Sequence, residues 1–179
     1  PWLALLAFTG GLFEAGLSAI SAAHASSTGL GLGLAASAAG AIGIGSFLLQ
    51  YPAGWAADHV LLRRVFTSCA LLLALASAAI GFAGNAPWLL WACGLVWGGV
   101  GGALYTLTII RIAHDFHGQA TAGGTAAMIT GYTWGGTVGP AASGAMLQAA
   151  GLPGLAGLLL LVAITALVAA RRVDAGPPR

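Results

Sequence analysis

The sequence predicts an all-α integral membrane protein, with six transmembrane helices in a single domain over residues 1–179. Two observations lead to this prediction. First, 59% of the residues are hydrophobic and only 6% are charged, whereas a soluble domain carries roughly 25% charged residues. Second, threading the chain about six times through a bilayer puts every strong cation on one side, which is the pattern of cytoplasmic loops. These six cations are Arg63, Arg64, Arg111, Arg171, Arg172 and Arg179.

Six apolar runs define the expected spans, since a span needs about 20 mostly apolar residues. Because backbone in lipid must satisfy its own hydrogen bonds, and because the runs are continuous rather than alternating, we expect helices and not strands. Outer connections are expected at 24–31, 84–87 and 150–153, and inner ones at 58–64 and 114–119. The expected spans are 2–23, 32–57, 65–83, 88–112, 120–147 and 155–170. Both termini are then cytoplasmic, and the arginines report topology rather than nucleic-acid binding.

The spans differ in character. Spans three and six are Leu/Ala tracts, which offer nothing to a polar solute and are expected to face lipid. Spans four and five carry glycines every four residues, a spacing that lets helix backbones approach closely. Tight packing is the commoner meaning of such a ladder, and packing that must also slide is the functional alternative. The glycines are Gly94, Gly98 and Gly102 in span four, and Gly131, Gly135 and Gly139 in span five.

Polar stripes mark spans one, four and five, and we expect these helices to border something wetter than lipid. The period of an α-helix places the members of each stripe on one face. Span five spreads its polar residues more widely, and span two adds Ser46, Gln50 and Pro52 near its inner half. The stripes are Glu14, Ser18 and Ser21 in span one, Trp97, Gly101, Tyr105 and Thr108 in span four, and Tyr132, Thr133, Trp134 and Thr137 in span five.

Glu14 is the only acidic residue inside an expected span. Its place in the span puts it roughly 18 Å deep at 1.5 Å per residue, near the bilayer midplane. An ionisable group there costs on the order of 2.5–3.5 kcal/mol and usually faces the interior of the bundle or a water-filled path. Glu14 is therefore expected either to couple protons or bind substrate, or, alternatively, to be a protonated side chain bonded to a neighbouring helix.

The first inner loop combines Gly54, Asp58, Arg63 and Arg64. A glycine four residues before the aspartate keeps Asp58 at a helix end without bulk behind it. The carboxylate is expected to accept hydrogen bonds from the N-terminus of a neighbouring helix, which the helix dipole favours. The two arginines are expected to anchor the loop at anionic headgroups. Plain positive-inside charge would explain the arginines but not the spacing of Gly54 and Asp58.

The stretch 50–58, Gln-Tyr-Pro-Ala-Gly-Trp-Ala-Ala-Asp, followed by Arg63-Arg64, resembles the signature loop of the major facilitator superfamily. That loop joins the second and third helices of each six-helix half. Gly139-Pro140 in the fifth span and Phe13-Glu14 in the first also resemble the family. The chain departs from the pattern at His59, where a basic residue is usual, and at Leu61-Leu62, where Gly-Arg is usual.

The resemblance implies one six-helix half of a transporter, built from two inverted three-helix repeats, and Glu14 with Pro52 favours the C-terminal half. It implies a secondary transporter that moves a small solute by alternating access, with proton coupling, in a bacterial inner membrane, with export (efflux) and import both open. The complementary half is its expected partner. The expected cavity residues are Glu14, Ser18, Trp97, Tyr105 and Tyr132, and the expected cytoplasmic gate is Gly54, Asp58, Arg63 and Arg64.

The rival interpretation is a non-transporting six-helix scaffold, or a degenerate half-transporter that binds a partner. Enzyme functions have little support, because the sequence contains no P-loop, zincin helix or comparable nucleophile motif. No cofactor or metal is expected: His114, Asp115 and His117 read as a solvated loop, since closed metal sites need about four ligands. Cys69 and Cys93 are single thiols in separate spans and are expected to pack, not to form a disulfide.

Overall fold

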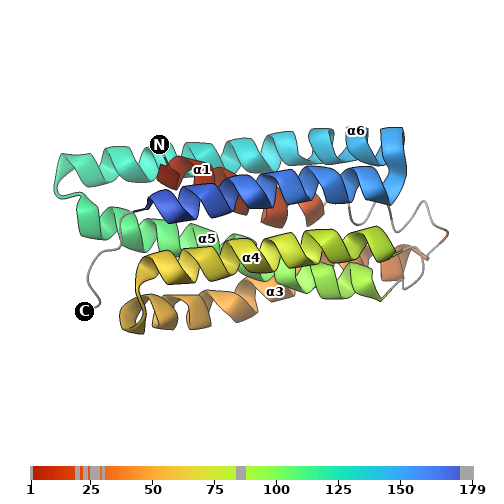
Figure 1. The fold of residues 1–179 in the computed structure, drawn as a ribbon, viewed down its shortest axis with the longest axis horizontal. Helices are drawn as coiled ribbons and strands as arrows, with labels where there is room; N and C mark the ends of the chain where they lie inside the picture. The colour runs from red at the N-terminus through yellow and green to blue at the C-terminus, as the bar shows by residue number, and fades with distance from the viewer. Residues whose placement is uncertain are drawn as a thin grey trace.

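Every secondary-structure element that the computed structural model describes is helical (Figure 1). The described residues are 2–18, 21, 24, 29, 31–83 and 88–173. Most of the predicted 24–31 connection, the 84–87 turn and Arg179 lie outside them. The elements are α1 (Trp2–Gly11), the π-helix η1 (Leu12–Gly16), α3 (Leu32–His59), α4 (Leu62–Ala79), the 3₁₀ turn η2 (Ile80–Phe82), α5 (Leu89–Asp115) and α6 (Gln119–Arg172).

Helix α6 doubles back on itself. Its 54 residues would make a straight rod of about 81 Å, but the backbone leaves helical geometry at Ala150 and Gly151. Gly151 takes a φ of 61°, a conformation that glycine adopts without steric cost. The two limbs, 119–149 and 152–172, therefore run antiparallel (Figure 1). The sequence predicted this reversal at 150–153.

Four helical stretches are long and apolar enough to cross a membrane, by length and composition. Trp2–Gly16 is a shorter apolar helix. The spanning candidates are Leu32–His59, Leu62–Phe82, Leu89–Asp115 and Gln119–Arg172. The predicted all-α membrane character is therefore confirmed, while the count of six spans remains a prediction because Gln119–Arg172 is a single candidate and Trp2–Gly16 is short.

The glycine ladders lie at the closest helix contacts. A Cβ added at Gly98 on α5 would collide with the carbonyl oxygen of Ile42 on α3. A Cβ at Gly135 on α6 would collide with the carbonyl oxygen of Phe8 on α1. The packing interpretation of the ladders is thus confirmed: α5 lies against α3, and the first limb of α6 lies against α1.

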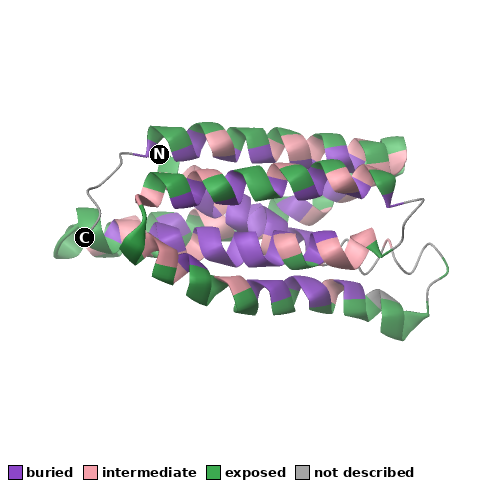
Figure 2. Cartoon of the chain, turned by 60° about the horizontal axis from the view of Figure 1, so that its bottom comes forward, coloured by how far each residue is buried: buried purple, intermediate pink, exposed green. Residues whose placement is uncertain are grey.

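Burial separates the inner from the outer faces of the helices (Figure 2). Helix α4 and the second limb of α6 pack through the fully buried Phe66, Leu73 and Leu159. Their opposite faces are apolar and exposed, for instance at Leu75 and Leu161. Such faces suit lipid, as predicted for the Leu/Ala tracts.

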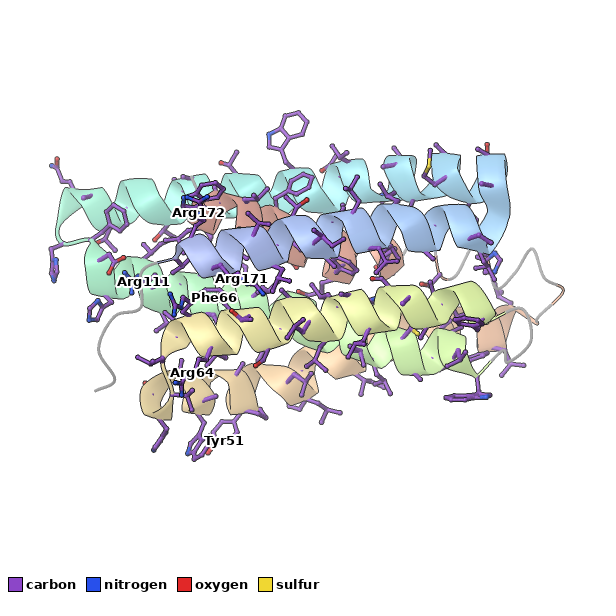
Figure 3. The ribbon with its side chains drawn as sticks, viewed as in Figure 1. Tyr51, Arg64, Phe66, Arg111, Arg171 and Arg172 are labelled. Atoms are coloured by element: carbon purple, nitrogen blue, oxygen red, sulfur yellow. The ribbon has the colours of Figure 1, made fainter. Side chains whose placement is uncertain are left out.

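The described arginines gather at one end of the bundle. Figure 3 labels Arg64, Arg111, Arg171 and Arg172, and all four lie where α4 begins, α5 ends and α6 ends. Arg63 lines a cavity together with Arg64 and Arg171. The arginines that the sequence assigns to one side of the membrane therefore also lie together in space.

Candidate functional site

Glu14 lies in the π-helical turn η1, which follows directly on α1. π turns inside α-helices are rare, and many of those that occur lie at functional sites. Glycines around the turn let other helices approach. A Cβ on Gly101 of α5 would lie 2.9 Å from the Cβ of Glu14. A Cβ on Gly11 would collide with the carbonyl oxygen of Tyr132 on α6. The carboxylate is thus held at a point where α1, α5 and α6 converge.

Both carboxylate oxygens of Glu14 accept hydrogen bonds from other helices. Ser46 on α3 donates through Oγ to Oε1 at 2.6 Å. Tyr132 on α6 donates through its hydroxyl to Oε2 at 2.9 Å. Gln50 donates through Nε2 to Ser46 Oγ at 3.1 Å. Hydrogen bonds to an ionised carboxylate are about twice as strong as bonds between neutral groups. The network joins the first helix to α3 and α6.

Tyr105 completes one wall of this site. Its ring meets that of Tyr132 edge-on, with centroids 5.1 Å apart, an arrangement that aromatic pairs prefer. Both rings pack against the buried Ala7, Ile112 and Met128. Glu14 itself is only half-buried, so the network is open on one side. We call Glu14, Ser46, Gln50, Tyr105 and Tyr132 the Glu14 cluster.

The structure brings together three of the five predicted cavity residues: Glu14, Tyr105 and Tyr132. Ser18 instead donates to the carbonyl oxygen of Ala15 in its own helix at 2.9 Å. Trp97 is only 1% exposed and packs against Phe13, with ring centroids 6.4 Å apart.

Trp97 and Thr108 therefore belong to the core rather than to a wet face. Thr108 is fully buried and donates to the carbonyl oxygen of Leu104. The sequence noted Ser46 and Gln50 but did not assign them to the site. The available signal was two polar side chains one turn apart in an apolar helix.

Of the predicted gate residues, Asp58, Arg63 and Arg64 are exposed and Gly54 is partly buried. Asp58 forms no hydrogen bond or ion pair within the described residues, so the predicted bonds to a neighbouring helix N-terminus are absent there. Among the described residues, the space beside Gly54, one helical turn before Asp58, is open: a Cβ there would have nothing within 4 Å. The ring of the neighbouring His59 stacks on the ring of Trp55, with centroids 4.4 Å apart.

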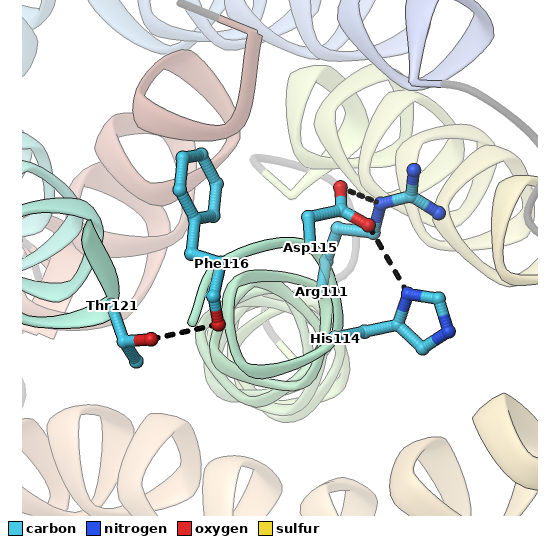
Figure 4. Close-up of polar contacts among 5 residues, drawn as sticks. All are labelled: Arg111, His114, Asp115, Phe116 and Thr121. Carbon is cyan, nitrogen blue, oxygen red and sulfur yellow. Dashed lines mark hydrogen bonds and ion pairs between the residues drawn. The ribbon is translucent and has the colours of Figure 1, made fainter. Parts of the chain in front are cut away.

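The connection between α5 and α6 is shorter than the predicted 114–119, because α5 continues through Asp115 and α6 begins at Gln119. Polar contacts surround it (Figure 4). Arg111 Nε donates to Asp115 Oδ2 at 2.6 Å, and His114 Nδ1 lies 3.2 Å from Asp115 Oδ1. Thr121 donates to the carbonyl oxygen of Phe116 at 2.7 Å. Asp115 is thus engaged in an ion pair. Within the described residues, no three His, Cys, Asp or Glu side chains cluster as a metal site would need.

Both cysteines are buried and free. Cys93 Sγ lies 3.4 Å from the carbonyl oxygen of Ala76, to which it donates. The two thiols take part in the packing between helices, as the sequence predicts.

Long apolar helices, arginines gathered at one end and a carboxylate bonded between helices define a multi-pass helical membrane protein. The profile of the Major Facilitator Superfamily matches residues 3–179, so the chain belongs to this family of membrane transporters. The resemblance seen in the sequence is confirmed. No curated protein matches the chain.

Proposed function

We propose that the chain is a single six-helix domain, the C-terminal half of a secondary transporter, and that Glu14 couples proton movement to the transport of a small solute. The observation that carries this proposal is the pair of hydrogen bonds from Ser46 and Tyr132 to the two oxygens of one intramembrane carboxylate. A carboxylate inside a membrane is energetically costly, so its presence there points to a functional role.

Protonation of Glu14 changes what the network can do. A carboxylate accepts hydrogen bonds from Ser46 and Tyr132 at once. A protonated carboxyl carries an O–H donor on one oxygen, which thereby becomes a poorer acceptor, so the bond that this oxygen accepts is weakened or reversed. Because the two hydroxyls belong to different helices, proton binding alters the tie between the first helix and either α3 or α6. This is the kind of two-state contact that alternating access requires.

The helix pairing supports two inverted three-helix repeats. If α1 corresponds to α5, and α3 to the first limb of α6, then the contact between α1 and α6 corresponds to the contact between α5 and α3. Both contacts are made through glycine ladders, at Gly135 and Gly98 respectively. The Glu14 cluster takes its residues from α3, α5, the first limb of α6 and the π-helix η1 that continues α1. Helix α4 and the second limb of α6 contribute none.

The complementary half would face α3 and the first limb of α6. Both carry large apolar side chains that the chain leaves open, such as Phe47 and Tyr51, each 80% exposed, and Trp134, 61% exposed. The arginine end would lie in the cytoplasm, with both termini on that side of a bacterial inner membrane, following the positive-inside rule.

The test is Glu14→Gln in the full-length protein, reconstituted in liposomes. Glutamine keeps the size and most hydrogen bonds of glutamate but cannot gain or lose a charge. Gradient-driven accumulation should be lost, while counterflow exchange of the same solute persists. Unchanged accumulation would overturn the coupling role and favour a scaffold in which Glu14 is only structural.

A further inference from the structure

A cleft of about 560 Å³ opens between the start of α4 and the end of α6. Its lining consists of Arg63, Arg64, Thr67, Ser68 and Arg171. Figure 3 labels Arg64 and Arg171 at the same end of the bundle, together with Phe66, which is fully buried. Residues that are far apart in the sequence thus place three guanidinium groups and two hydroxyls around one space. We call this the arginine cleft.

The arginine cleft holds positive charge without a described counter-charge. Of the four acidic residues in the sequence, Asp115 is paired with Arg111 and Glu14 lies in its own cluster. Asp58 does not line the cleft, and Asp174 lies outside the described residues. The only described ion pairs are those that Asp115 makes with Arg111 and His114. The charges of the cleft therefore repel one another and favour an anion between them.

The local backbone adds to this preference. Arg63 and Arg64 stand in the first turn of α4, where the positive end of the helix dipole disfavours cations and favours anions. The N-cap residue Leu61 provides no side-chain cap. Thr67 donates its hydroxyl to the carbonyl oxygen of Arg63, whereas the exposed Ser68 hydroxyl is free to donate among the described residues. Donors and charge thus converge where an oxyanion would lie.

We propose that the arginine cleft binds a phosphate oxyanion, and that an anionic phospholipid presents it. Guanidinium groups match phosphate geometry through paired N–H donors. The cleft lies where the exposed apolar faces of α4 and α6 end, for instance at Leu72 and Val168. That is the level of lipid headgroups, so the acyl chains can follow these apolar faces. The bound phosphate ties the first turn of α4 to the last turn of α6.

Arg172 provides a matched control. It follows Arg171 at the same exposed helix end, but it lines a different cavity of about 250 Å³ with Trp2 and Leu3. The paired Arg111 and Asp115 also line that cavity. Arg171→Gln and Arg172→Gln therefore remove the same charge from the same helix turn, and only the first removes a ligand from the arginine cleft.

The experiment is native mass spectrometry of the full-length protein in mild detergent, titrated with phosphatidylglycerol, phosphatidylcholine or inorganic phosphate. We expect selective binding of phosphatidylglycerol, weakened about fivefold by Arg171→Gln, because each basic residue near an anionic surface contributes about that factor. Arg172→Gln should change it less than twofold. If Arg171→Gln does not fold, Arg63→Gln and Ser68→Ala test the same cleft from α4.

Three outcomes would overturn the proposal. Equal weakening by Arg171→Gln and Arg172→Gln would show unspecific charge attraction. Equal binding of phosphatidylglycerol and phosphatidylcholine would show that the anion is not recognised. Binding of inorganic phosphate without lipid selectivity would assign the cleft to a free anion. The measurement does not involve transport, so its result is independent of the proposed role of Glu14.

Discussion

Tyr132 donates a hydrogen bond to Glu14 across 118 positions of sequence, and the two atoms are 2.9 Å apart. The bond spans the contact between the first helix and α6, where Gly11 leaves room for the Tyr132 backbone. A single proton-sensitive group is thereby tied to one of the tightest helix contacts in the described structure. Any change in the charge of Glu14 acts on that contact directly.

Tyr132→Phe should reduce gradient-driven uptake by about tenfold or more, because a hydrogen bond to a charged group is worth about 1.5–3 kcal/mol. Tyr105→Phe is the matched control. Tyr105 touches Tyr132 through its ring, and its hydroxyl makes no hydrogen bond within the described residues. Initial uptake rates of the two variants in liposomes give the comparison. Equal losses would remove the Tyr132 hydroxyl from the mechanism.

Ser46→Ala should destabilise the protein by about 1.5–3 kcal/mol, since it leaves one oxygen of Glu14 without a donor. It also removes the acceptor of the Gln50 amide. Ser18→Ala should be nearly silent, because the Ser18 hydroxyl bonds only to its own helix. Unfolding of both variants in detergent, followed by tryptophan fluorescence, measures the difference. A Ser18→Ala loss as large as that of Ser46→Ala would contradict the assigned network.

The sequence places Glu14 and Tyr132 in one site, but it does not predict the hydrogen bonds that Ser46 and Tyr132 make to the carboxylate. A lone acid in an apolar run is visible in any reading, whereas Ser46 and Tyr132 meet it only because glycines fix how far each helix approaches. Ser18 was expected beside Glu14 from the α-helical period. The π turn over Leu12–Gly16 breaks that period, so the i, i+4 spacing no longer places both side chains on one face.

Trp97 is a residue that the sequence places in the site and the structure places in the core. Its position in a polar stripe suggested a wet face, but its ring fills the space against Phe13. The reversal at Gly151 was predictable because turn residues act locally. The one-sided arginines were predictable because the charges of the loops can be summed from the sequence. Contacts between distant helices depend on packing, which a single sequence does not display.

The two ends of α5 should be accessible from opposite sides of the membrane. Trp88 and His117 flank this helix and are both exposed, and 27 residues span about 40 Å. In intact cells, a membrane-impermeant thiol reagent should label Trp88→Cys but not His117→Cys. The native Cys69 and Cys93 are buried and give a low background. The opposite pattern would place the arginine end outside.

Gly98→Ala should destabilise the protein by about 1–3 kcal/mol, the usual cost of overpacking a tight interface. The added methyl group would collide with the carbonyl oxygen of Ile42, and backbone cannot rotate away as a side chain can. Helices α3 and α5 must then separate. Gly43→Ala is the control, because it lies one position from Ile42 on the same helix, yet a Cβ there has nothing within 4 Å. That variant should be neutral or slightly stabilising, since alanine favours helix by up to about 1 kcal/mol over glycine.

The separation caused by Gly98→Ala should also move Ser46 away from Glu14, so uptake should fall together with stability. Thermal unfolding and uptake measured on both variants test this link. Full uptake in a destabilised Gly98→Ala would show that the glycine contact is structural only and does not position the Glu14 cluster.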